Sequence, residues 1–159
     1  MRGMPLAPGH GQDVSSSPGK RVELLHATPE LTVTWSEYAP GEPGPDPHTH
    51  REHTDSFFVL TGELAYRVGP DLEPLILRAG EWLSVPPNVI HTFANTSDQP
   101  ATFLNYHSPD GGFAAYMRGE QPGFDSFDPP EGGGLPAERA TYLASPPARS
   151  SEHSGELPA

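Results

Sequence analysis

Residues 47–61 have the sequence PHTHREHTDSFFVLT. His48 and His50 lie two positions apart, and in an extended chain such side chains point to the same side, about 7 Å apart at their Cα atoms. Asp55 has the same parity as Phe57 and Val59, so a strand here would turn its carboxylate inward among apolar side chains. A carboxylate is costly in such a place unless a cation or a hydrogen-bond donor meets it. The stretch therefore predicts a strand that carries candidate ion ligands on its inner face.

A second stretch, residues 90–95 (IHTFAN), repeats the pattern. His91 has the parity of Phe93 and is expected to point inward as well. Three imidazoles and one carboxylate would then meet in one apolar cavity. Imidazole suits iron, manganese, nickel, copper or zinc (Fe, Mn, Ni, Cu or Zn), whereas magnesium and calcium prefer oxygen ligands. The pattern predicts a site for one divalent transition metal, and the chain has no cysteine that could add a thiolate ligand.

The rest of the chain is interrupted by 17 glycines and 21 prolines, too often for long helices. The runs between these breaks are short and partly alternating, which predicts an all-β fold, an antiparallel sandwich or barrel. One short helix is expected at 113–118, with Asp110 placed to cap its first turn. The strands are expected at 21–26, 31–36, 55–61, 64–68, 74–78, 82–85, 90–95 and 102–107.

The apolar residues concentrate in the middle of the chain, and this divides it into three parts. Residues 1–20 are expected to be a flexible N-terminal tail and 21–118 the folded barrel. Residues 119–159 form a Gly- and Pro-rich extension, of which 124–144 is expected to lie extended over the barrel or over a partner subunit. Both chain ends are expected to be mobile.

The charge of the chain excludes one class of partner. Nine Lys and Arg residues against 21 Asp and Glu residues give a formal net charge of −12, which leaves no basic stripe for nucleic acid. No segment approaches the roughly 20 apolar residues of a membrane span, and the first residues lack the apolar core of a signal peptide. We therefore expect a soluble, cytoplasmic protein that does not bind membranes.

The two stretches together resemble the two motifs of the cupins. In the first cupin motif a His-x-His pair is followed by Glu and then by Gly, and His48, His50, Asp55 and Gly62 have that spacing. The second motif contains Gly, Pro, Gly, His and Asn at fixed intervals, and its positions are occupied here by Gly80, Pro86, Asn88, His91 and Asn95. The resemblance covers about residues 41–95. It implies a double-stranded β-helix, or jelly-roll, barrel in which His48, His50, Asp55 and His91 are the metal ligands.

The sequence departs from the cupin motifs in three places. Gly41 lies one position too early, and Asn88 replaces a turn glycine, which is harmless because Asn tolerates left-handed backbone angles. The third departure, Asp55 in place of Glu, shortens the side chain by one carbon–carbon bond, roughly 1.5 Å. Two roles follow for Asp55. It either binds the metal directly or acts from outside the ligand set as a hydrogen-bond partner or catalytic proton acceptor.

A weaker resemblance, at residues 104–113, is to the single-domain bacterial cupins of the quercetin-dioxygenase-like group. It implies a metal-dependent dioxygenase, an oxidoreductase whose small aromatic or enolisable substrate coordinates the metal. A metal-assisted isomerase, lyase or cyclase that works without oxygen is the alternative, and a non-enzymatic cupin that binds a small ligand is a third. Cupins usually pair, and an open barrel has sheet edges to cover, so we expect a homodimer.

The sequence also predicts where other side chains near the motifs point. Glu52 and His53 lie in the same loop and could substitute for a ligand, but both are expected to face solvent. His107 belongs to the last strand, of which one face lines the cavity, but parity does not tell which face that is. The aromatic and apolar residues expected to contact a substrate are Trp35, Phe57, Val59, Tyr66, Phe93 and Tyr106.

Overall fold

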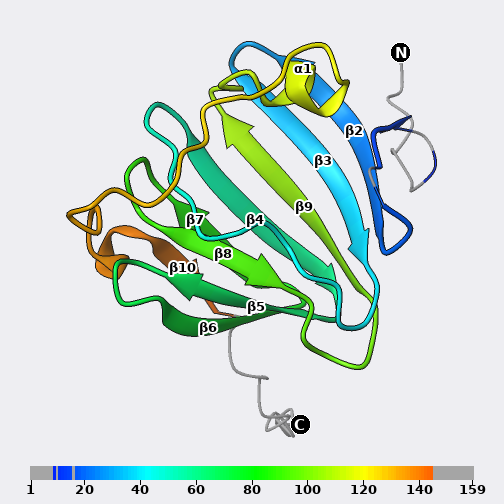
Figure 1. Cartoon of the computed structure of the whole chain (residues 1–159). Coiled ribbons are helices and arrows are strands. Elements are labelled where there is room, and N and C mark those ends of the chain that lie inside the picture. The colour runs from blue at the N-terminus through cyan, green and yellow to red at the C-terminus, as the bar shows by residue number, and fades with distance from the viewer. Residues whose placement is uncertain (1–8, 10, 16, 145–159) are drawn as a thin grey trace, which may run out of the picture.

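The computed structural model describes residues 9, 11–15 and 17–144. Two antiparallel sheets make up this part of the chain, and the smaller packs against the inner face of the curved larger one (Figure 1). The larger sheet has the order β1 (Gln12–Asp13), β2 (Lys20–Thr28), β3 (Leu31–Tyr38), β9 (Ala101–Ser108), β4 (Thr54–Thr61), β7 (Trp82–Val85) and β10 (Thr141–Leu143). The smaller sheet has the order β6 (Glu73–Arg78), β5 (Glu63–Val68) and β8 (His91–Ala94).

Helical structure is confined to two short segments of the described residues, α1 (Phe113–Met117) and the 3-10 turn η1 (Ala137–Arg139). Asp110 stabilises the first turn of α1, as predicted. Its carboxylate accepts hydrogen bonds from the backbone N–H groups of Gly112 and Ala114, both at 2.9 Å. The all-β jelly-roll architecture with one short helix after the last long strand is thereby confirmed.

Alternation along the strands decides which side chains fill the space between the sheets. On β4, Asp55, Phe57 and Val59 point inward, as their shared parity predicted. Phe57 and Phe93 both pack against Tyr66, with ring centroids 5.0 and 5.3 Å away. These rings hold the small sheet against the large one, and they close the barrel beneath the two histidine motifs. The core comprises Tyr38, Phe57, Val59, Leu64, Tyr66, Val68, Leu77, Leu83, Val85, Val89, Phe93, Ala101 and Phe103.

Strand β3 uses its two faces in an unexpected way. Its small polar residues Thr34 and Ser36 line the interior, whereas Trp35 lies on the outer face of the sheet, 5.6 Å beneath the Arg21 guanidinium. Tyr106 on β9 is likewise on the outer face, against Trp82 with a centroid distance of 5.5 Å. Trp35 and Tyr106, which were expected to contact a substrate, therefore do not line the inner cavity. Parity groups residues by face, but it does not say which of two mixed faces is the inner one.

The folded unit extends beyond the expected range 21–118 on both sides. β1 pairs with β2 through Gln12 opposite Leu24, and β10 pairs with β7 through Tyr142 opposite Leu83. In Figure 1 the segment after α1 runs along one end of the barrel before reaching β10. The two chain ends are predicted to be mobile. Most of the residues concerned, 1–8 and 145–159, lie outside the described residues.

None of the helices in the described part of the chain has the length and hydrophobicity that a membrane crossing requires.

Candidate metal centre

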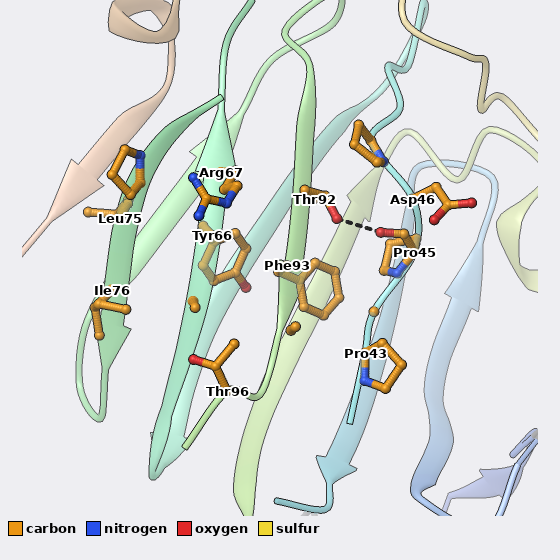
Figure 2. A pocket seen from close by; sticks show the side chains of 15 residues that line it. Pro43, Pro45, Asp46, Tyr66, Arg67, Leu75, Ile76, Thr92, Phe93 and Thr96 are labelled. Carbon is orange, nitrogen blue, oxygen red and sulfur yellow. Dashed lines mark hydrogen bonds between the residues drawn. The ribbon is translucent and has the colours of Figure 1, made fainter. Parts of the chain in front are cut away.

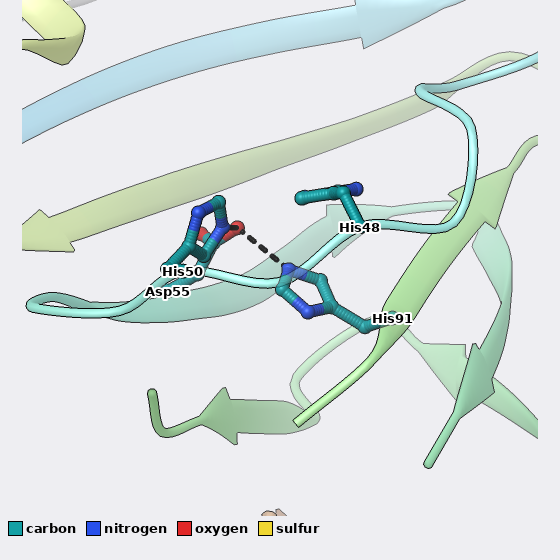
Figure 3. Close-up of side chains that lie close together, drawn as sticks. All are labelled: His48, His50, Asp55 and His91. Carbon is teal, nitrogen blue, oxygen red and sulfur yellow. Dashed lines mark hydrogen bonds and ion pairs between the residues drawn. The ribbon is translucent and has the colours of Figure 1, made fainter. Parts of the chain in front are cut away.

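Four side chains from three parts of the chain converge inside the barrel (Figure 3). His48 and His50 come from the loop before β4, Asp55 from β4 and His91 from β8. The backbones of His48 and His91 are hydrogen-bonded to each other in both directions, at 3.1 and 3.0 Å, so these two histidines are held side by side. One ligand atom from each of the four residues lies within 4.8 Å of the others. The structure thus brings together all four predicted ligands.

Backbone carbonyls orient the three imidazole rings. Nδ1 of His48 lies 2.8 Å from the carbonyl oxygen of Asp46, Nδ1 of His50 lies 2.7 Å from that of Asp125, and Nδ1 of His91 lies 3.1 Å from that of Val89. A carbonyl oxygen can only accept, so Nδ1 carries the hydrogen in all three rings. In its neutral form each ring then has a free lone pair on Nε2, which is the arrangement of a metal-binding histidine with its outer partner in place.

The contacts of Asp55 test whether these residues fit a cation. Its Oδ2 atom lies 3.3 Å from Nε2 of His50 and 3.1 Å from Nε2 of His91. Two lone pairs and a carboxylate oxygen can approach this closely only with a cation between them, either a proton or a metal ion. Two donor atoms that share a metal at ~2.0–2.2 Å are themselves roughly 3.0–3.5 Å apart. The observed spacing fits, and the shorter Asp side chain reaches the site.

Charge and burial are consistent with this interpretation. Burial, together with the neighbouring His91, lowers the pKa of His48 to about 4, so this ring is neutral near pH 7. Burial alone would lower the pKa of His50, but the hydrogen bond and charge of Asp55 outweigh it and raise that pKa. Burial alone would also raise the pKa of Asp55, yet His107 and the contacts with His50 and His91 hold it well below its usual range. The carboxylate is therefore ionised and ready to bind a cation.

The second oxygen of Asp55 is also engaged. Oδ1 accepts a hydrogen bond of 2.5 Å from Nδ2 of Asn105, and it lies 3.7 Å from Nε2 of His107. Asn105 and His107 both point inward from β9, so the face of this strand that carries His107 is the one that lines the cavity. Asn105 was missed by sequence reasoning because nothing near it in the chain marks it. Its partner Asp55 lies 50 positions away.

His53 is buried, contrary to the expectation of solvent exposure, whereas Glu52 is exposed as expected. The His53 side chain has none of its surface exposed. Both of its ring nitrogens have partners, since Nδ1 faces a carboxylate oxygen of Asp125 at 2.8 Å and Nε2 faces Nδ1 of His107 at 2.9 Å. Asp125 was not singled out from the sequence. Its partner lies 72 positions away, in the segment before β4.

A cavity of about 340 Å³ is lined by three of the four candidate ligands, His48, His50 and Asp55. Phe93 is the only one of the expected substrate contacts that lines it, while Phe57, Val59 and Tyr66 belong to the core. Lys20 is the one lysine or arginine among the described residues of the lining, with Nζ 5.2 Å from the ring centre of Tyr38. The residues that share this lining are Val22, Thr34, Ser36, Tyr38, Pro45, His48, His50, Asp55, Phe103, Asn105, His107, Phe113, Tyr116, Met117, Phe124 and Ser126.

A second hollow, of about 470 Å³, lies on the outer side of the small sheet, and Figure 2 shows it. It is bounded by the Pro43–Pro47 loop and by outward-facing residues such as Arg67 and Thr92, and the Thr92 hydroxyl donates a hydrogen bond of 2.5 Å to the carbonyl oxygen of Pro45. No histidine is among the described residues that line it. Chemistry that needs the imidazoles therefore belongs to the inner cavity.

The fold and the site define a jelly-roll protein with a three-histidine, one-aspartate candidate metal centre. Residues 34–107 match the sequence model of the cupin domain family. The match places a cupin domain at residues 34–107, as the two motifs predicted. A comparison with curated proteins gave no match.

Solved structures show the same fold. KdgF from Halomonas sp. has a TM-score of 0.58 at 20% identity, over 67% of this chain and 94% of the other. An RmlC-like cupin from Shewanella frigidimarina has a TM-score of 0.56 at 24% identity, over 65% and 88%. A sugar phosphate isomerase of the cupin superfamily from Silicibacter pomeroyi has a TM-score of 0.51 at 25% identity, over 57% and 59%.

Proposed function

We propose that this protein is a metal-dependent cupin enzyme, and that it is a dioxygenase acting on a small substrate that coordinates the metal through an oxygen atom. The observation that carries the proposal is the convergence of three oriented imidazoles and one ionised carboxylate beside a cavity of about 340 Å³. His48, His50, Asp55 and His91 would hold the ion. A bound divalent transition metal supplies Lewis acidity toward a substrate oxygen and, if it is redox-active, a route for electrons to dioxygen.

The surrounding side chains support specific roles in such a reaction. Asp55 accepts one hydrogen bond at Oδ1 and faces two histidines with Oδ2, and its pKa is held low, so a ligand role suits it better than that of a catalytic proton acceptor. Phe93 and Phe124 line the cavity and would exclude water from an aromatic substrate. The Lys20 ammonium would face an enolate, phenolate or carboxylate oxygen, since no described carboxylate forms an ion pair with it.

Metal analysis followed by oxygen-uptake assays tests the proposal. Protein purified without chelator is expected to contain about one divalent transition metal per chain. The metal-loaded protein is then assayed with flavonols, 1,3-diketones and catechols, with His91→Ala as the inactive control. Oxygen consumption that matches substrate loss supports the dioxygenase. Absence of uptake with every substrate in a metal-loaded protein would overturn it.

A second candidate is a metal-assisted isomerase, lyase or cyclase that uses the same ligands without oxygen. The hydroxyl groups of Thr34, Ser36 and Ser126 favour it, because they give the cavity a polar side suited to a hydroxylated substrate. A solved structure with 25% identity is a sugar phosphate isomerase. Turnover that is the same under strict anaerobiosis distinguishes this candidate from the dioxygenase.

A further inference from the structure

The extension that follows the cupin domain contributes Asp125, which touches the loop of the candidate ligands at several points. The Asp125 carboxylate accepts hydrogen bonds from the backbone N–H groups of Arg51, Glu52 and His53, at 2.9, 2.8 and 3.1 Å. Its backbone carbonyl faces Nδ1 of His50 at 2.7 Å. One residue outside the family-matched range 34–107 thus fixes both the loop and the ring of a candidate ligand.

From Asp125 a continuous chain of polar contacts leads to the other side of the site. His53 lies between Asp125 and His107, with distances of 2.8 Å to the Asp125 carboxylate and 2.9 Å to Nδ1 of His107. Nε2 of His107 is 2.9 Å from Oδ1 of Asn105, and Nδ2 of Asn105 donates to Oδ1 of Asp55 at 2.5 Å. Four side chains therefore connect the extension to the candidate ligand Asp55.

The last contact has only one possible direction. Nδ2 of Asn105 lies between Oδ1 of Asp55 and the carbonyl oxygen of Ser56, at 2.5 and 3.0 Å. Both of these atoms are acceptors, so the amide nitrogen must face them and the amide oxygen must face His107. In this orientation Asn105 donates a hydrogen bond to Oδ1 of Asp55, and Oδ2 of Asp55 faces His50 and His91.

The chain of contacts is also dry and tightly packed. The side chains of His53 and His107 have 0% and 3% of their surface exposed. Phe113 from α1 stacks on the His107 ring, with centroids 3.7 Å apart, and Phe124 lies against both Phe113 and His53, at 5.2 and 6.2 Å. Polar contacts in such surroundings are stronger than in water, and an incomplete set is costly.

We propose that Asp125, His53, His107 and Asn105 are positioning residues that orient Asp55 for metal binding, so that the C-terminal extension is part of the metal centre. The inference rests on the proposed function, since it concerns the affinity for the metal. It differs from that proposal in assigning a role to residues that would not touch the ion.

The test uses Co(II) titrations of the full chain and of Asp125→Asn and Asn105→Ala variants. Asp128→Asn is the matched control, because Asp128 is an exposed aspartate in the same segment. Loss of an outer partner typically weakens metal binding by 10- to 100-fold. We expect both variants to bind Co(II) about 10- to 100-fold more weakly and to show an altered visible absorption spectrum at saturation. A role in folding alone would leave the spectrum of the bound ion unchanged.

A double variant, Asp125→Asn with Asn105→Ala, tests whether the two ends act through one chain. If they do, the combined loss is clearly smaller than the product of the two single losses. Wild-type affinity and spectrum in both single variants, with Co(II) bound by the wild type, overturn the inference. Failure of the wild type to bind Co(II) would instead defeat the proposed function. If Asp125→Asn does not fold, Asn105→Ala alone decides, since it leaves the loop contacts of Asp125 intact.

Discussion

At the scale of single residues, the three candidate histidine ligands differ from the other histidines of the described part of the chain in what their Nδ1 atoms face. His48, His50 and His91 each turn Nδ1 to a backbone carbonyl, so that each has Nε2 to offer a metal. His26, by contrast, is exposed on β2. Because the backbone already holds the rings in place, metal binding has to order them very little, and the free-energy cost of that ordering is small.

Replacing His91 by Ala is expected to weaken metal binding by at least about 100-fold, more than the loss of an outer partner would. The reason is that His91 supplies one of only four donor atoms in the described site. Competition with a chromophoric chelator measures the affinity, and His26→Ala provides a histidine control that should match the wild type. Unchanged affinity in His91→Ala would place the metal elsewhere.

Lys20 offers a second prediction at this scale. A hydrogen bond to a charged group contributes about 1.5–3 kcal/mol, roughly 10- to 150-fold in affinity. Lys20→Met is therefore expected to weaken binding of an anionic substrate by about that factor, while Lys20→Arg retains part of it. Isothermal titration with a carboxylate ligand and its neutral amide analogue checks the origin of the effect. An equal loss for the amide would show that the charge of Lys20 is not what matters.

At the scale of elements, the loop between β3 and β4 carries two ligands and is held against β8. Pro43 forms an isolated bridge with Ala94, and a Cβ atom added at Gly44 would lie 2.0 Å from the carbonyl oxygen of Phe93. This close approach lets the loop run alongside β8, so that His48 reaches the backbone of His91. The absence of a side chain at Gly44 is thus a condition for the geometry of the metal centre.

Gly44→Ala is expected to lower the free energy of unfolding by about 1–3 kcal/mol, as overpacking usually does. It should also weaken metal binding, because the loop must move away from β8. Urea unfolding and Co(II) titration measure the two effects. Gly123→Ala is the control, since a Cβ atom there meets nothing within 4 Å. A Gly44→Ala variant as stable as this control would contradict the prediction.

How far the sequence predicted these elements depends on the range of the interactions involved. The ligands His48, His50 and Asp55 were found because they lie within one stretch, where spacing alone determines the face of the chain. Asp125 and Asn105 could not be found in this way, because their partners lie 72 and 50 positions away. Trp35 was misplaced for a different reason. The interior beside the site accepts small polar side chains, so the apolar face of β3 became the outer one.

At the scale of the whole molecule, the outer face of the large sheet is rich in partly exposed apolar side chains. Phe58, Trp82 and Tyr106 lie there on adjacent strands β4, β7 and β9, and Leu60 at the end of β4 is 38% exposed. Large apolar patches on a soluble protein commonly mark interfaces. The homodimer predicted from the sequence remains a prediction, and this face is where we expect the two copies to meet.

Sedimentation equilibrium tests the dimer. The wild type is expected to sediment with twice the mass of the chain, and the Tyr106→Glu variant as a monomer. The substitution would bury one additional negative charge from each copy in the interface, and each chain already has a net charge of −12. Leu135→Glu is the control, since Leu135 is 39% exposed and lies outside the strands of both sheets. A dimer that persists in Tyr106→Glu would require a different interface.

The placement of Lys20 has a practical consequence. The chain has no other lysine, so apart from the terminal α-amino group its only primary amine lies at the wall of the cavity. An amine-reactive fluorophore would therefore label this protein at a single side chain. Protection of that amine from acylation would report occupancy of the cavity by any small molecule, whether or not it is turned over, and so offers a screen for the natural ligand that needs no knowledge of the reaction.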